Sequence, residues 1–142
     1  MVISARVHYS CLAMLELARR AGDACPVAAG EISERHEIPG PFLNQILRAL
    51  RSSGWVESIR GSHGGYRLVV DPKTITLLDI AEATGCQEPQ HRMDDSTAAA
   101  RTLCDIWTAA SDSARAVLGG WTLADLVDRC QDHEDIATMF YI

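Results

Sequence analysis

The feature that most constrains the fold of this chain is a change of hydrophobic period near residue 54. Before this point, apolar residues recur every three or four positions, which is the period of one face of a helix. After it they alternate, over residues 55–59 and again over 66–70, as in a strand. The loop 60–65 between these stretches contains three glycines. The pattern predicts a β-hairpin.

Three helices are predicted ahead of the hairpin. The first follows a capping serine, Ser4, the second covers residues 28–36 with Ala28 facing the core, and the third begins at Pro41. Three helices followed by a hairpin, all before residue 72, is the order of a winged helix-turn-helix.

Beyond residue 72 the chain is predicted to be helical. Short helices are expected at 76–84 and 122–130, and a long one at 96–118, while the tail 131–142 is ambiguous. The expected fold class is therefore mainly α with a small β-hairpin. It is a winged helix-turn-helix with a long C-terminal dimerisation helix.

We divide the chain into a winged helix-turn-helix DNA-binding domain, residues 1–72, and a helical dimerisation and sensor region, residues 73–142. Ser96 is expected to cap the long helix. One face of that helix is apolar, and we expect it to form an isologous dimer interface. The residues of this apolar stripe are Leu103, Ile106, Trp107, Ala110, Ala114 and Val117.

Charge is distributed unevenly between these two parts. The net charge of −6 for the 142 residues, taken alone, argues against a polyanionic partner. Residues 1–72 carry eight basic and seven acidic side chains, a net of +1, whereas residues 73–142 carry five and twelve, a net of −7. Any contact with nucleic acid is therefore expected in the first part.

The sequence gives no support for catalysis or for a membrane protein. Its five cysteines are scattered and form no CxxC pair, which favours a reducing cytoplasm over a disulfide framework. No apolar segment is long enough to span a bilayer. No nucleophile signature, carboxylate pair or phosphate-binding loop stands out. We expect a cytoplasmic protein that is not an enzyme.

The third helix and the hairpin loop carry side chains suited to DNA. Asn44 and Gln45 can pair with adenine in the major groove, and Arg48 or Arg51 with guanine or phosphate. Arg60 precedes the loop tip and can enter the minor groove. A polar helix face or a glycine-rich turn is by itself ordinary surface structure. Their occurrence in this order is more specific than either one alone.

A family likeness extends over nearly the whole chain, and its most specific part is Arg-Gly-Ser-His-Gly-Gly-Tyr within the hairpin. The stretches that carry it are residues 4–17, 38–46, 54–56, 58–68, 75–80 and 122–126. In these stretches the sequence resembles the Rrf2 family of bacterial transcriptional regulators.

The resemblance implies a winged-helix homodimer, paired through the long helix, that binds palindromic promoter DNA. It also implies that Asn44 and Gln45 face bases and that Arg60 reaches the minor groove. The candidate DNA-binding residues are Pro41, Asn44, Gln45, Arg48, Arg51, Arg60, Ser62, His63, Gly64, Gly65 and Tyr66.

The resemblance also raises the question of an iron–sulfur cluster, which many members of the family hold through three closely spaced cysteines before the long helix. This chain departs from that pattern, because only Cys86 and Cys104 lie in the corresponding segment. His8 and His91 are further candidate ligands. A [2Fe–2S] site needs four ligands, so no metal or cluster is assured. Cys104 has the alternative of a small buried apolar residue.

The leading hypothesis is a sequence-specific DNA-binding repressor that acts as a homodimer. Its signal is expected to be thiol oxidation, a small ligand or a partner protein. Two alternatives stay open. One is a cluster-sensing regulator of the same family, and the other is a winged-helix module that docks a protein and has lost DNA binding.

Overall fold

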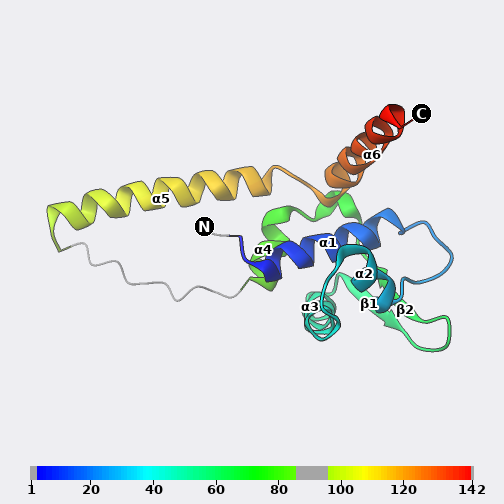
Figure 1. Ribbon diagram of the computed structural model, residues 1–142. Helices are drawn as coiled ribbons and strands as arrows, with labels where there is room; N and C mark the ends of the chain where they lie inside the picture. Colours follow the sequence, from blue (N-terminus) through cyan, green and yellow to red (C-terminus); the bar gives the residue numbers. More distant parts are fainter. Residues whose placement is uncertain (1–2, 86–95, 142) are drawn as a thin grey trace.

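A computed structural model of the chain describes residues 3–85 and 96–141 (Figure 1). It is mainly helical with one two-stranded antiparallel sheet, which confirms the predicted fold class. The elements are α1 (Ala5–Arg19), α2 (Ala29–His36), α3 (Gly40–Ser52), β1 (Val56–Ile59), β2 (Gly65–Leu68), the 3-10 turn η1 (Pro72–Thr74), α4 (Leu77–Thr84), α5 (Ala98–Gly119) and α6 (Leu123–Phe140).

Four of the described helices, α1, α4, α5 and α6, start after a Ser or Thr whose side chain caps them. Ser4 accepts a hydrogen bond from the backbone N–H of Val7, as predicted for the cap of α1. Thr76 and Thr122 each form a reciprocal capping box, with Asp79 and Asp125 respectively. These caps are local, because donor and acceptor lie three residues apart.

At the start of α5 the predicted cap is wrong by one residue. Thr97, not Ser96, is the capping residue, and its hydroxyl accepts from the backbone N–H of Ala100 at 3.0 Å. Both residues can cap a helix, so the sequence does not distinguish between them.

The core lies where α1, α2, α3 and α4 meet the first turn of α6. Ile32, Ile38 and Ile80 are each at most 2% exposed in it. The expectation for Ala28 is wrong, since Ala28 is exposed. The neighbouring Val27 is buried instead, because its backbone forms an isolated bridge with Tyr66 of β2 that turns its side chain inward.

The C-terminal helix is longer than predicted. A helix was expected over 122–130, but α6 continues to Phe140. The last two turns have no buried residue, so hydrophobic period could not indicate them. Side chains hold them locally, as in the bond from the Gln131 amide to Asp135, and Arg19 of α1 forms an ion pair with Glu134 at 2.8 Å.

A buried carboxylate joins α1 to α2. Glu16 is 1% exposed, and Arg35 donates to its Oε1 at 3.2 Å while Nε2 of His36 lies 3.2 Å from its Oε2. A buried charge requires such partners, since an unpaired one is costly. The sequence analysis did not find this contact, because Glu16 only interrupts an apolar run there.

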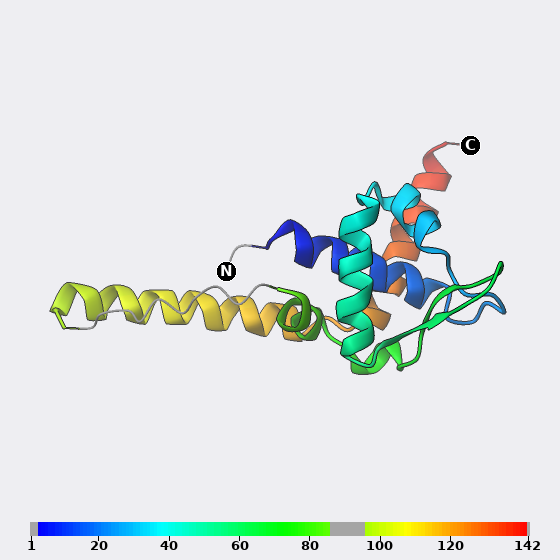
Figure 2. The ribbon, with the colours of Figure 1, turned by 90° about the horizontal axis from the view of Figure 1, so that it is seen from below.

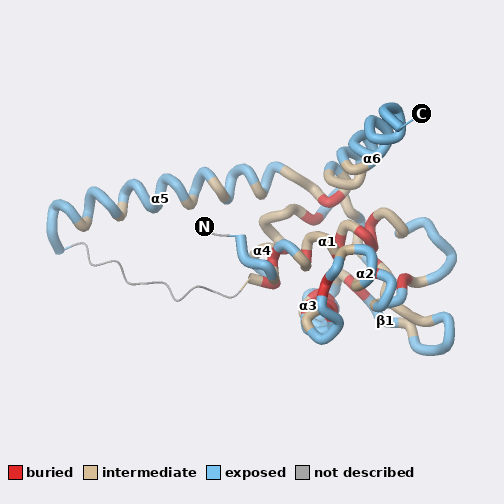
Figure 3. Tube along the Cα trace, in the orientation of Figure 1, coloured by how far each residue is buried: buried red, intermediate tan, exposed pale blue. Residues whose placement is uncertain are grey.

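The long helix α5 projects away from this core (Figures 1 and 2). None of its residues is buried, and Figure 3 shows it exposed or half-exposed along its whole length. Arg115 forms an ion pair with Glu82 of α4 at 2.6 Å near the point where α5 returns to the core. Among the described helices, none is both long and apolar enough to cross a membrane.

Replacing Glu16 by glutamine should lower the free energy of unfolding by about 1–3 kcal/mol, because the Arg35 and His36 side chains lose a charged acceptor. Urea denaturation followed by circular dichroism measures this. Glu134→Gln is the matched control, since it removes an exposed ion pair worth about 0–1 kcal/mol. Equal effects of the two substitutions would contradict a structural role for the buried contact.

Candidate nucleic-acid interface

The turn between α2 and α3 sets the angle at which α3 leaves the core. Glu37 has a φ of 53°, a left-handed conformation that ends α2. The Ser33 hydroxyl donates to the carbonyl of Ile38 at 2.5 Å, and the Ile38 side chain is buried. Pro39 then leads directly into α3. The two helices form a helix-turn-helix whose second helix is α3.

One face of α3 is buried and the other is free. Leu43, Ile46, Leu47 and Leu50 are each at most 1% exposed, which fixes the rotation of the helix about its axis. The opposite face consists of exposed residues, and these are Pro41, Asn44, Gln45, Arg48 and Arg51. All five predicted DNA-contacting positions of this helix therefore point to solvent.

The hairpin is tied to the core at its base. In the register of β1 and β2, Val56 faces Leu68 and Ile59 faces Gly65. Val27 pairs with Tyr66 through two backbone hydrogen bonds of 2.9 and 2.8 Å. We call the β1–β2 hairpin with its loop the wing. The Tyr66 side chain is half-buried, so it contributes to the attachment of the wing as well as to its surface.

The loop of the wing depends on glycine at particular positions. A Cβ at Gly64 would lie 2.1 Å from the Ile59 carbonyl oxygen, and one at Gly65 would lie 2.3 Å from the Val27 carbonyl oxygen. Gly61 has a φ of 119°, which side-chain-bearing residues rarely adopt. Arg60, Ser62 and His63 are exposed around this backbone.

Figure 2, seen from below, shows α3 crossing this face of the molecule with the hairpin extending beside it. A helix with a neighbouring hairpin matches how winged domains meet duplex DNA, with the helix in the major groove. Asn44 and Gln45 are of the types that pair with adenine there.

The arginines of this face are unpaired. The guanidinium groups of Arg48, Arg51 and Arg60 form no ion pair or hydrogen bond within the described part of the chain. Elsewhere arginines serve the fold, as in Arg20, which binds Asp23 and Glu31. Unpaired guanidinium groups beside a free helix face suit phosphate or guanine contacts.

Arg67 belongs to the wing, yet it is already engaged within the fold. Its guanidinium donates to the Ala24 carbonyl at 3.2 Å and lies 4.0 Å from the Glu57 carboxylate. It anchors β2 to the loop after α1.

The two candidate metal ligands that the structure describes, His8 and Cys104, do not come together within one chain. Cys86 and His91 lie outside the described residues. Cys104 is partly buried on α5, fourteen positions from Leu118, which corresponds to about 21 Å along the helix. Leu118 lies near α1, where His8 is exposed. In residues 3–85 and 96–141, no three His, Cys, Asp or Glu side chains form a metal site, so the described donors do not fit a cluster.

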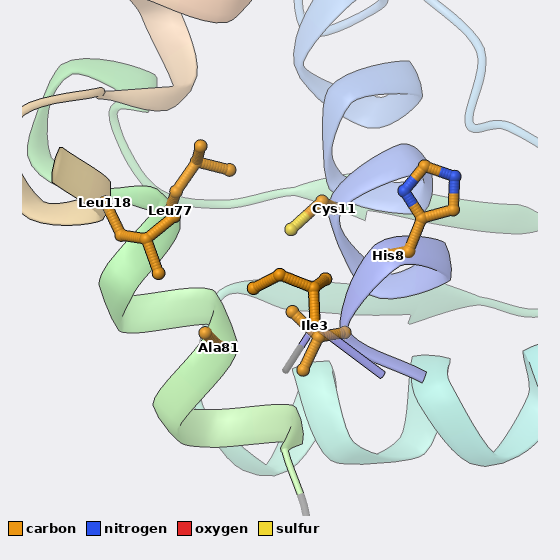
Figure 4. Close-up of a pocket in the computed structure, with 7 residues that line it drawn as sticks. Ile3, His8, Cys11, Leu77, Ala81 and Leu118 are labelled. Carbon is orange, nitrogen blue, oxygen red and sulfur yellow. The ribbon is translucent and has the colours of Figure 1, made fainter. Parts of the chain in front are cut away.

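A separate apolar pocket of about 230 Å³ lies between α1, α4 and the end of α5 (Figure 4). The residues that line it are Ile3, Val7, His8, Cys11, Leu77, Ala81 and Leu118. Burial raises the pKa of the Cys11 thiol to about 11. Cys11 is therefore a poor nucleophile at neutral pH, in agreement with a packing role.

The sequence matches the model of one protein family over residues 3–129. That family is Rrf2, described as an iron-dependent transcriptional regulator. Among curated proteins, the chain is 35% identical to the HTH-type transcriptional regulator CymR of Bacillus subtilis over 143 residues, covering 100% of both chains. It is 33% identical to the HTH-type transcriptional regulator IscR of Yersinia pestis, covering 96% of this chain and 85% of that one.

Solved structures agree with these matches. IscR of T. potens has a TM-score of 0.78 with 32% identity, covering 94% of this chain and 90% of that one. CymR of B. subtilis, described as the global cysteine regulator, has a TM-score of 0.77 with 32% identity, covering 91% and 98%.

Substituting Gly65 by alanine should disturb the wing and lower stability by about 1–3 kcal/mol, because the new Cβ meets the backbone of Val27. The melting temperature measures this. Gly30→Ala in α2 is the control: nothing lies within 4 Å of its Cβ, and alanine favours a helix by up to about 1 kcal/mol. A Gly65→Ala protein as stable as the unsubstituted one would contradict the close approach.

Proposed function

This chain belongs to the Rrf2 family of transcriptional regulators, and from that premise we propose that it represses transcription by binding palindromic promoter DNA as a homodimer. The observation that carries the proposal is the exposed polar face of α3 beside the wing. The proposed activity is binding and not catalysis. Because promoters of bacteria lie in the cytoplasm, we also propose that location.

The recognition roles rest on side-chain chemistry and position. Asn44 and Gln45 lie in the first two turns of α3, the part of a recognition helix that contacts base edges. Arg48 and Arg51 follow on the same exposed face and are suited to phosphate or guanine. Arg60, directly after β1, is suited to the minor groove beside the wing.

The distribution of charge supports an orientation in which α3 and the wing face the DNA. The excess of acidic residues lies in the last half of the sequence, and Figure 1 shows α6 on the side of the molecule opposite α3. A polyanion is repelled from the acidic side, so α3 and the wing face it. With a net charge of only +1 over residues 1–72, affinity depends on a few unpaired arginines.

Pairing of two copies follows from the exposed apolar stripe of α5. Leu103, Ile106 and Trp107 are 49–53% exposed, and Val117 is 62% exposed. An apolar face on a projecting helix is typical of a protein interface. Two copies present two recognition helices, which is why we propose a palindromic site.

Gel-shift titration over salt tests the DNA proposal. Gln45→Ala should weaken binding to the cognate site by about 1–3 kcal/mol and leave random DNA unaffected, because a base contact is lost. Arg51→Ala, the matched control on the same face, should weaken both duplexes and reduce the salt slope by about one unit. Equal losses on both duplexes for Gln45→Ala would show that it reads no base.

A duplex of the protein's own upstream region that is not retarded even at low salt would contradict DNA binding altogether. That result would favour the docking module that has lost DNA binding. Phosphate contacts make log K fall with log salt at a slope near −0.9 per contact, so the titration also reports how many phosphate contacts form.

For the signal, we propose a sensor without a resident iron–sulfur cluster. A [2Fe–2S] cluster needs four ligands, whereas the corresponding segment of this chain supplies only two thiols, Cys86 and Cys104. Among the described residues, Cys104 and His8 are far apart within one chain, and no three donors form a metal site. A cluster bound by Cys86, Cys104 and further ligands would supply redox sensing. Without a cluster, the proposed signals are thiol oxidation, a small ligand or a partner protein.

Protein purified without oxygen should accordingly be colourless and contain neither iron nor acid-labile sulfide, even after attempted reconstitution. Visible absorbance and iron analysis measure this. Coloured protein that loses its colour on Cys104→Ser, but keeps it on the control Cys25→Ser, would establish the cluster-sensing alternative instead.

A further inference from the structure

The loop that follows α1, residues 20–28, lies between the helix-turn-helix and the wing, and we call it the α1–α2 loop. Figures 1 and 2 both place it on the same side of the molecule as the hairpin. Residues 21–25 of the loop are exposed, and Gly22 adds backbone freedom. Such a loop keeps one conformation only if contacts with other segments hold it.

Two separate contacts attach the wing to this loop. Val27 and Tyr66 exchange backbone hydrogen bonds of 2.9 and 2.8 Å, which depend on no side chain. Arg67 adds a side-chain bond, from its guanidinium to the Ala24 carbonyl at 3.2 Å. A single attachment point leaves the hairpin free to rotate about it, whereas a second point three residues away restricts that rotation.

Arg20 connects the same loop to the helix-turn-helix. Its Nε donates to Asp23 at 3.1 Å, and its Nη1 donates to Glu31 of α2. Asp23 directly precedes Ala24, so the two arginines bind adjacent residues of the loop. Their contacts form a continuous connection from α2 to β2.

We propose that this connection fixes the angle of the wing relative to α3, and that Arg67 is the positioning residue that sets where Arg60 meets DNA. The inference rests on the proposed DNA binding, and it adds a residue that contributes to binding without touching DNA.

A hairpin of this size is easily displaced. Each strand has four residues, and an isolated two-stranded hairpin is marginally stable. Val56 and Leu68 bury its base, but Arg60 lies beyond them, about 13 Å along the strand from Val56. A rotation of about 10° at the base would move Arg60 by about 2 Å, which is enough to break a hydrogen bond.

The surroundings of Arg67 favour a positioning role over a phosphate contact. Glu57 is its partner in the strand register, and the Glu57 carboxylate lies 4.0 Å from the guanidinium. This negative charge offsets the positive charge of Arg67 and favours keeping the guanidinium within the fold. Arg60 differs, because its guanidinium has no such partner among the described residues.

A double-mutant cycle measured by gel-shift titration tests this role. Arg67→Met removes the donor and should weaken binding to a duplex of the protein's own upstream region about fivefold. In the Arg60→Ala protein the same substitution should cost nothing further, because a residue that acts through Arg60 has no effect once that side chain is gone. Equal losses in both backgrounds would show that Arg67 contacts DNA itself, and would overturn the proposal.

Arg129→Met is the matched control, since it removes the same charge far from the wing. The Arg129 guanidinium lies over the Trp121 ring, 5.3 Å from its centroid, and Figure 1 shows α6 on the side opposite α3. Affinity for the duplex should be unchanged in this variant. A loss as large as that of Arg67→Met would assign the effect to net charge and would also overturn the proposal.

Amide hydrogen exchange tests the connection without DNA. Arg67→Met should speed exchange of the Val27 and Tyr66 amides about tenfold, because one of the two attachments is lost, while the amides of α3 keep their rates. Unchanged rates at Val27 and Tyr66 would refute the positioning role even in a protein that binds DNA. A parent protein that retards no duplex would instead refute the proposed function, and the exchange rates would still decide whether the Arg67 contact holds the wing.

Discussion

The burial of α1 is the constraint on which the rest of this structure depends. Seven of its fifteen residues are buried, including Glu16. α2, α3, α4, α6 and strand β2 all contact it. Because α1 is packed on so many sides, the helix-turn-helix and the return of α5 and α6 are positioned relative to one helix. A carboxylate can be buried there only because Arg35 and His36 supply its partners.

The proposed DNA binding depends on side chains that the packing of the core does not engage. The arginines that stabilise the fold are bound to carboxylates or carbonyls, whereas Arg48, Arg51 and Arg60 are not bound within the described residues. An acidic chain can therefore still present a face suited to DNA. Total charge is a poor guide in such a protein, because the sign of the field near α3 depends on which charges are paired.

The same reasoning applies to apolar surface. The core needs no part of the α5 stripe, so it stays exposed in one chain. Leu118, which follows Val117 of the stripe in the sequence, is a lining residue of the pocket between α1 and α4. Contiguous exposed apolar surface marks an interaction site, and the proposed homodimer would cover the stripe.

The sequence by itself determined the order of the helices and the hairpin, and the cap of α1 at Ser4. These features depend on residues two to four positions apart, as in the Thr122 and Asp125 box. The exposed face of α3 was also predictable, because burial of Leu43 and Ile46 fixes where Asn44 and Gln45 point. Only the tertiary structure decided the burial of Glu16, the exposure of Ala28, the extent of α6 and the engagement of Arg67. The first, second and fourth of these features depend on partners far along the chain, which a local hydrophobic period does not reveal. The end of α6 has no buried face, so no hydrophobic period could indicate that the helix continues.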